Sequence, residues 1–230
     1  MNRNWILLLA LLGCDRAPAP SPAAISVFAA ASLKEAVTSI STEWTKKTGQ
    51  QVRLQFEASS TLVRQIKEGA PADLFITAAP EWLDQVRTTD RSDWLSNTLV
   101  VVVRKDVKTF DLARAQSLAL ANEQVPAGKY AKAALAHLKV KPPERTIYGS
   151  NVRDVLSKVS QGGAEAGIVY ATDAAVDPEV KIAFTFPPES HPKILYSAGV
   201  LTPAAKNLYD ALREPWAMEI TAKFGFTPVE

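Results

Sequence analysis

The chain has a single cysteine and only two histidines among its 230 residues. Because Cys14 is the only cysteine, we expect no disulfide, metal–thiolate site or catalytic thiol inside a folded domain. His137 and His191 do not have the spacing of metal ligands, so they are expected to be solvated or packed side chains. These shortages argue against thiol and metal-centred chemistry.

The chain also lacks the motifs of several common enzyme classes. It contains no Gly-x-Ser-x-Gly nucleophile turn, no Gly-x-x-x-x-Gly-Lys phosphate loop and no glycine-rich dinucleotide fingerprint. We therefore expect no enzyme. A serine hydrolase and a lipoprotein that binds other proteins are the alternative classes, and saturable anion binding without turnover would exclude the first.

An excess of charge of one sign is absent as well. The chain carries 26 basic and 24 acidic residues, a formal net charge of +2. This balance gives no electrostatic footprint for nucleic acid. Without the first two dozen residues, roughly 200 remain, which is enough for one large domain or two small lobes.

The N-terminus has the pattern of a targeting segment. Residues 1–14 place Arg3 before an apolar stretch that is too short for a permanent membrane span. The stretch ends in Leu-Leu-Gly-Cys, which resembles a bacterial lipobox and predicts lipidation of Cys14. Asp15 resembles an inner-membrane retention signal, and the proline-rich residues 15–24 predict a flexible tether. The alternative is a plain signal peptide that is cleaved near Ala23.

Hydrophobic patterns alternate between the strand and the helix period along the rest of the chain. Strands are expected at residues 25–30, 52–56, 73–77, 99–103, 117–121, 146–148, 166–170 and 194–201. Helices are expected from residue 33 until Gly49 and at residues 61–68, 81–86, 130–137, 152–160, 204–212 and 216–224. This order predicts an α/β fold with mostly parallel sheets flanked by helices.

The chain is expected to form two lobes joined by two crossovers. Residues 99–103 are the strongest strand pattern, and the charged residues that follow mark a change of lobe. The first lobe is therefore expected to comprise residues 24–103 plus 196–230, and the second lobe residues 104–195.

Several expected strands end at small or hydroxyl-bearing residues that open a helix. Ser32 ends the first strand and, with Glu35, fits a capping box; Ser59 follows the second strand. Residues 125–128 and Asn151 open two more helices, and Tyr170 ends a further strand. Because the carboxyl ends of strands line the crevice of an open α/β sheet, these groups are expected to converge. They are neutral donors without an evident carboxylate acceptor, a set that suits a fully deprotonated oxyanion.

Five of these motifs, in this order, resemble the periplasmic molybdate-binding proteins of ABC importers. They are Phe28-Ala-Ala-Ala-Ser-Leu33, Ser59-Ser-Thr-Leu62, Gly69-Ala-Pro-Ala-Asp-Leu-Phe-Ile76, Val125-Pro-Ala-Gly128 and Gly167-Ile-Val-Tyr170. The resemblance implies a two-lobe, type II periplasmic binding protein fold that closes on its ligand. It also implies a periplasmic monomer that passes its ligand to an ABC permease, and the lipobox pattern with Asp15 predicts that this monomer is lipid-anchored to the inner membrane.

The resemblance implies molybdate or tungstate as the ligand, held by hydrogen bonds, with no cofactor and no directly coordinated metal. Ser32 and Ser59 would contribute hydroxyl and backbone donors, Ala127 and Val152 backbone N–H groups, and Tyr170 its phenol. Ser60 is the neighbour that would replace Ser59. A sulfate-type or other tetrahedral oxyanion receptor on the same fold is the alternative function.

Arg153 is ambiguous at this level, since it either points at the anion or lies beside the site. A site of neutral donors does not need a cation. We therefore expect Arg153 on the surface or in a supporting position.

Overall fold

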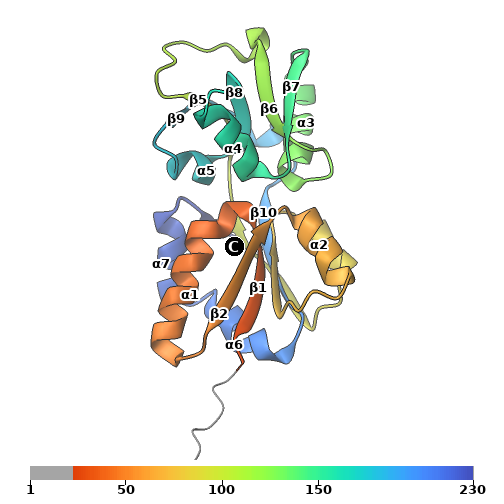
Figure 1. Cartoon of the computed structure of the whole chain (residues 1–230), viewed down its shortest axis with the longest axis vertical. Helices are drawn as coiled ribbons and strands as arrows, with labels where there is room; N and C mark the ends of the chain where they lie inside the picture. Colours follow the sequence, from red (N-terminus) through yellow and green to blue (C-terminus); the bar gives the residue numbers. More distant parts are fainter. Residues whose placement is uncertain (1–22, 230) are drawn as a thin grey trace, which may run out of the picture.

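Two β-sheets, one above the other in Figure 1, organise residues 23–229, the part of the chain that the computed structural model describes. The first sheet has six strands in the order β11-β4-β10-β3-β1-β2. Their bounds are β1 (Ile25–Ala30), β2 (Val52–Glu57), β3 (Leu74–Thr77), β4 (Asp90–Ser96), β10 (Leu195–Val200) and β11 (Thr227–Pro228). This sheet is therefore built from both ends of the described chain.

The second sheet has five strands in the order β7-β6-β8-β5-β9. Their bounds are β5 (Leu99–Arg104), β6 (Ser117–Ala121), β7 (Arg145–Gly149), β8 (Ala166–Tyr170) and β9 (Val180–Thr185). Both sheets are mixed: β1 pairs in parallel with β2 and β3, and β6 in parallel with β7 and β8, while the remaining pairs are antiparallel. The expected α/β fold of two sheets flanked by helices is confirmed. The sheets are mixed and not mostly parallel as expected, because β10 and β5 each run antiparallel to both of their neighbours.

The position of β5 corrects the expected boundary between the lobes. Residues 99–103 are wholly buried, because β8 and β9 pair with this strand on its two edges. The strand therefore belongs to the second sheet, and the first crossover consists of Asn97 and Thr98 rather than following Val103. The second crossover, residues 186–194, returns the chain from β9 to β10.

Helices cover both faces of the first sheet, as Figure 1 shows for α1 (Lys34–Thr48) and α7 (Pro215–Lys223) on one face and α2 (Ser59–Lys67) on the other. The period of two along β1 produces this arrangement. Val27 and Ala29 enter the large hydrophobic core, whereas Phe28 packs in a smaller cluster with Leu62 of α2. Gly49 ends α1 in a left-handed conformation, as the sequence predicts.

The second sheet carries α3 (Pro126–His137), α4 (Val152–Ser160) and α5 (Ala171–Ala175), and α6 (Lys206–Ala211) packs against β10 of the first. A helix is expected at residues 81–86, but this segment forms a 3₁₀ helix over Pro80–Gln85 instead. None of the helices in the described part of the chain combines the length and apolar character of a membrane span.

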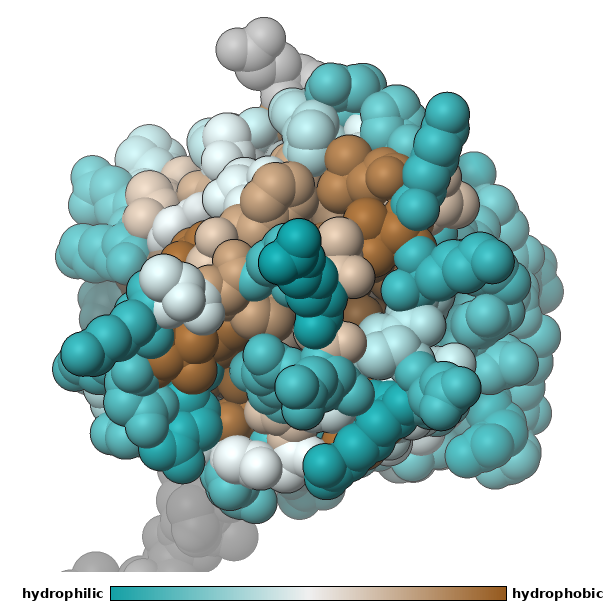
Figure 2. Space-filling view, turned by 90° about the horizontal axis from the view of Figure 1, so that it is seen from above, coloured by the Kyte–Doolittle hydropathy of each residue, from teal (hydrophilic) through white to brown (hydrophobic). Residues whose placement is uncertain are grey.

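Figure 2 views the molecule from the end formed by the second sheet and shows apolar residues gathered across the middle of that face, with hydrophilic ones around them. The large hydrophobic side chains that are exposed in the described structure all lie in this lobe: Tyr148 on β7, and Ile182 and Phe184 on the edge strand β9.

Candidate anion-binding site

One small cavity lies where the carboxyl ends of strands from both sheets meet. The first lobe contributes residues 30–32, residues 57–59 and Ala78 to its wall. The second lobe contributes residues 125–127, Asn151, Val152 and Tyr170. The cavity has a volume of about 20 Å³, which is far below the range of roughly 300–1,000 Å³ that organic ligands occupy. Its size suits a small ion.

The structure brings all five sequence-predicted residues to this cavity, and each is almost fully buried. The exposed fractions are 2% for Ser32, 1% for Ser59, 2% for Ala127, 4% for Val152 and 1% for Tyr170. Ser60, the alternative to Ser59, is absent from the wall and is only partly buried.

The two helix starts of the second lobe each present a backbone N–H group. Pro126 opens α3 and has no N–H, so the first donor of this helix belongs to Ala127. At the start of α4, Oδ1 of Asn151 accepts hydrogen bonds from the N–H groups of Arg153 and Asp154. This cap leaves the N–H of Val152, which has no partner within the helix, at the cavity wall.

Both serine hydroxyls in the wall have a hydrogen-bond partner in the protein. Oγ of Ser59, the first residue of α2, accepts a hydrogen bond of 3.0 Å from the N–H of Ala78, so its own proton is free for a ligand. Oγ of Ser32 lies 2.9 Å from the hydroxyl of Tyr196. Ser32 is inside a 3₁₀ turn (Ala31–Leu33) and caps no helix, and the expected capping box with Glu35 does not form.

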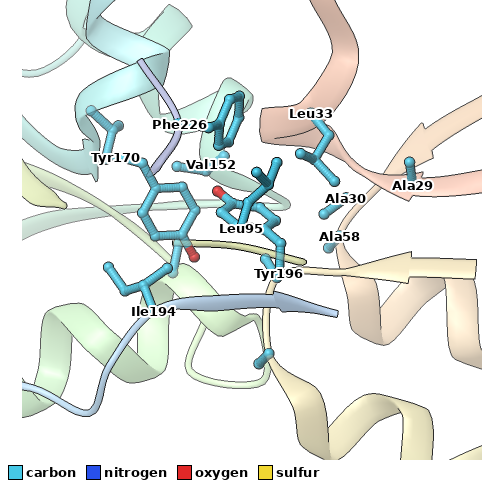
Figure 3. Close-up of a cluster of buried hydrophobic side chains, with 14 of the residues drawn as sticks. Ala29, Ala30, Leu33, Ala58, Leu95, Val152, Tyr170, Ile194, Tyr196 and Phe226 are labelled. Carbon is cyan, nitrogen blue, oxygen red and sulfur yellow. The ribbon is translucent and has the colours of Figure 1, made fainter. Parts of the chain in front are cut away.

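Tyr170 is the strongest single indication of a ligand. Its ring is wedged edge-on against Tyr130 and Tyr196, with centroid distances of 6.5 and 6.1 Å. Figure 3 shows Tyr170 beside Tyr196, with Val152 close by. Within the described residues the buried Tyr170 hydroxyl has no hydrogen-bond partner, a deficit that costs about 1–3 kcal/mol. Burial raises the pKa of Tyr170 well above its usual value, so the hydroxyl stays protonated and can donate.

One carboxylate lies in the wall, contrary to the expectation of a site without an acceptor. Glu57 ends β2, and its Oε2 accepts a hydrogen bond of 3.1 Å from Nδ2 of Asn151 across the two lobes. The contact occupies one of the two carboxylate oxygens. Within residues 23–229, no cluster of three or more His, Cys, Asp or Glu side chains is arranged to hold a metal ion.

Arg153 lies beside the cavity and connects the two lobes. Its guanidinium contacts Glu35 of α1 at 2.5 and 3.0 Å and the carbonyl oxygen of Ser32 at 3.4 Å. Its Nε is 2.6 Å from Oδ1 of Asp173, a fully buried residue of the second lobe. Arg153 is absent from the cavity wall, as expected for a supporting position.

Asp173 links this ion pair to the binding residue Tyr170. Its Oδ2 accepts a hydrogen bond of 3.2 Å from the N–H of Tyr170. Burial raises the pKa of Asp173 to about 6, although the Arg153 guanidinium and the Tyr170 N–H both lower it. Burial also lowers the pKa of Arg153, but Asp173 and Glu35 outweigh it and raise this pKa overall. No local pattern in the sequence indicates these partners.

Comparison with known proteins agrees with the fold. The family model for bacterial extracellular solute-binding proteins matches residues 25–227. The molybdate-binding protein ModA of Escherichia coli (strain K12) is 39% identical, and the alignment covers 99% of each chain. The solved periplasmic molybdate-binding protein of Azotobacter vinelandii superposes with a TM-score of 0.79 at 20% identity, covering 90% of this chain and 100% of that chain. The sulfate-binding protein SubI of Mycobacterium tuberculosis gives 0.76 at 18% identity, covering 90% and 87%.

Replacing Arg153 tests the connection between the lobes. Arg153→Met leaves the carboxylates of Glu35 and Asp173 without their cation, and the Asp173 carboxylate is buried without access to water. We expect the free energy of unfolding to fall by about 3 kcal/mol, measured by urea denaturation. The control is Arg114→Met, which removes an exposed ion pair with Asp111 and should cost less than about 1 kcal/mol. Equal losses in the two variants would contradict the connecting role.

Proposed function

The chain belongs to the family of bacterial extracellular solute-binding proteins, and we propose that it binds molybdate outside the cytoplasmic membrane and delivers it to an ABC permease. The observation that carries this proposal is the buried, unpartnered hydroxyl of Tyr170 in the wall of a cavity of ionic size. The full-length similarity to the Escherichia coli molybdate-binding protein supports the choice of anion.

Five groups hold the anion in this proposal. Ser32 and Ser59 donate through their hydroxyls, Ala127 and Val152 through their backbone N–H groups, and Tyr170 through its phenol. Neutral donors at helix starts stabilise a desolvated dianion without a counter-ion. A fully deprotonated tetrahedral oxyanion can accept from every one of them.

The lobes enclose the ligand by rotating about the two crossovers. One crossover is only two residues long, Asn97 and Thr98, and the other comprises residues 186–194. Contacts across the cleft, such as that of Arg153 with Glu35, stabilise the closed form. The transport step takes place in the permease, and we assign no catalytic step to this chain.

Selectivity then depends on the size of the cavity. Molybdate and tungstate are tetrahedral dianions of nearly the same size, and both fit this proposal. Sulfate has the same charge and shape but shorter bonds to oxygen, so it cannot reach all donors at once. A sulfate receptor is the second candidate, and the fold similarity to a sulfate-binding protein is the observation that favours it.

Calorimetric titration of the purified full-length protein with molybdate, tungstate, sulfate and phosphate tests the function. We expect molybdate and tungstate to bind more tightly than sulfate by at least about tenfold, the effect of one misplaced hydrogen bond. If sulfate bound more tightly than molybdate, the protein would be a sulfate receptor, the second candidate. Absence of binding by every oxyanion would reject the proposal.

Tyr170→Phe tests the site. The variant removes one donor to a charged ligand while the ring packing remains, so the dissociation constant for molybdate should rise roughly ten- to hundredfold. The matched control is Tyr148→Phe, which removes the same atom from a residue that is 53% exposed and outside the cavity. An unchanged affinity in Tyr170→Phe would place Tyr170 outside the binding site.

We also propose that Cys14 is lipidated and anchors the protein to the inner membrane through the tether of residues 15–24. Residues 1–22 lie outside the part of the chain that the structure describes, and the proposal rests on the Leu-Leu-Gly-Cys pattern. Cys14→Ser should move the protein from the membrane fraction to the soluble fraction without changing its molybdate affinity. Ser21→Ala, in the tether, is the control. Continued association of Cys14→Ser with the membrane would contradict the anchor.

A further inference from the structure

Asn97 lies in the first crossover, and its hydrogen-bond partners fix the orientation of its side-chain amide. Its Oδ1 accepts a hydrogen bond of 2.8 Å from the backbone N–H of Thr98, which can only donate. The amide nitrogen Nδ2 therefore faces the other way, toward Oγ1 of Thr172 at 2.8 Å and the hydroxyl of Tyr196 at 3.1 Å. Asn97 thus presents only donors to Tyr196.

The hydroxyl of Tyr196 has two partners, and their chemistry sets the direction of its own proton. Tyr196 is fully buried in β10, and its oxygen accepts from Asn97. Its single proton has Oγ of Ser32, at 2.9 Å, as the remaining partner. If Ser32 donated instead, the Tyr196 proton would be buried without an acceptor, which is costly. Burial keeps this phenol protonated by raising its pKa well above the usual value.

The same reasoning fixes the polarity of Ser32. Its Oγ accepts from Tyr196, so its proton is left for the cavity that it lines. Ser59 has the same polarity, because its Oγ accepts from the N–H of Ala78. The hydroxyls of Ser32 and Ser59 therefore both face the ligand as donors.

We propose that Asn97 and Tyr196 are positioning residues that fix the Ser32 proton toward the bound anion, so that the Ser32 hydroxyl donates to the ligand and does not accept from it. The inference rests on the proposed function and adds a specificity mechanism to it. A fully deprotonated oxyanion gains a hydrogen bond from Ser32, whereas an oxyanion that carries a proton, such as hydrogen phosphate, finds no acceptor there. The free oxygen of Glu57 is present in every variant below, so it does not affect their comparison.

The hydrogen bonds from Asn97 to Tyr196 and from Tyr196 to Ser32 form a relay. Asn97→Asp reverses the direction of this relay. One carboxylate oxygen still accepts from the N–H of Thr98, and the second oxygen accepts from the Tyr196 hydroxyl. The Tyr196 oxygen then accepts a hydrogen bond from the Ser32 hydroxyl, so that the lone pairs of Ser32 face the cavity. We expect the dissociation constant for molybdate to rise roughly ten- to hundredfold in calorimetry. Phosphate should compete with molybdate in this variant and not in the wild-type protein.

The double variant Asn97→Asp with Tyr196→Phe separates the relay from the added charge. Tyr196→Phe alone should weaken molybdate binding less than about tenfold, because Ser32 keeps its proton for the ligand. With the phenol removed, the introduced carboxylate has no hydroxyl through which to act on Ser32, and the double variant should match Tyr196→Phe within about twofold. A double variant as weak as Asn97→Asp would show that the charge alone causes the loss and would overturn the inference.

Circular dichroism establishes that each variant is folded. If Asn97→Asp does not fold, Asn97→Ala removes the donor to Tyr196 and frees the relay to adopt either direction. Phosphate should then compete with molybdate in Asn97→Ala, and an unchanged selectivity would overturn the inference. If the wild-type protein binds molybdate and the variants keep its selectivity, the relay alone is refuted. If the wild-type protein binds no oxyanion, the proposed function is refuted as well.

Discussion

The ion-pair network around Arg153 is the interaction on which the site depends. One guanidinium joins Glu35 and the Ser32 carbonyl of the first lobe to the buried Asp173 of the second, and Asp173 in turn holds the backbone of Tyr170. Groups from both lobes make up the cavity wall, so the cavity exists only while the lobes are held together. Desolvating these charges is costly, and the cost is offset by the attraction between the guanidinium and the two carboxylates.

The cavity wall itself follows a different rule. The groups proposed to hold the anion are neutral, and most of the side chains among them have their acceptor capacity used by the protein: Ala78 donates to Ser59, and Tyr196 contacts Ser32. Arg153 and its two carboxylate partners lie beside the cavity, and Glu57 is the one charged side chain in its wall. The groups proposed to hold the anion are dipoles, which bind an anion strongly where water is excluded. Separating charges from donors in this way lets the lobes close on an anion without adding a cation to its surroundings.

Much of the site is predictable because its determinants are local. Proline has no N–H, so Pro126 at the start of α3 makes Ala127 the first donor of that helix. Asn151 caps α4 through hydrogen bonds that span at most three residues. The strands β1 and β8 follow from short apolar runs. The strand β4 has no such pattern, because its first four residues, Asp90 to Asp93, are polar, and it forms by pairing with β10 and β11. The apolar run of β5 predicts a strand but does not indicate its sheet.

The sequence by itself determined the α/β class and the helix starts with their free N–H groups, because these follow from the chemistry of a few neighbouring residues. The five predicted binding residues, which all lie in the cavity wall, follow from the resemblance of their motifs to a known family. Only the tertiary structure decided that β5 joins the second sheet, that Arg153 contacts Glu35 and Asp173, and that Tyr196 lies between Asn97 and Ser32 and contacts both. These contacts join residues up to 164 positions apart, and a side chain's local sequence carries no information about partners so distant.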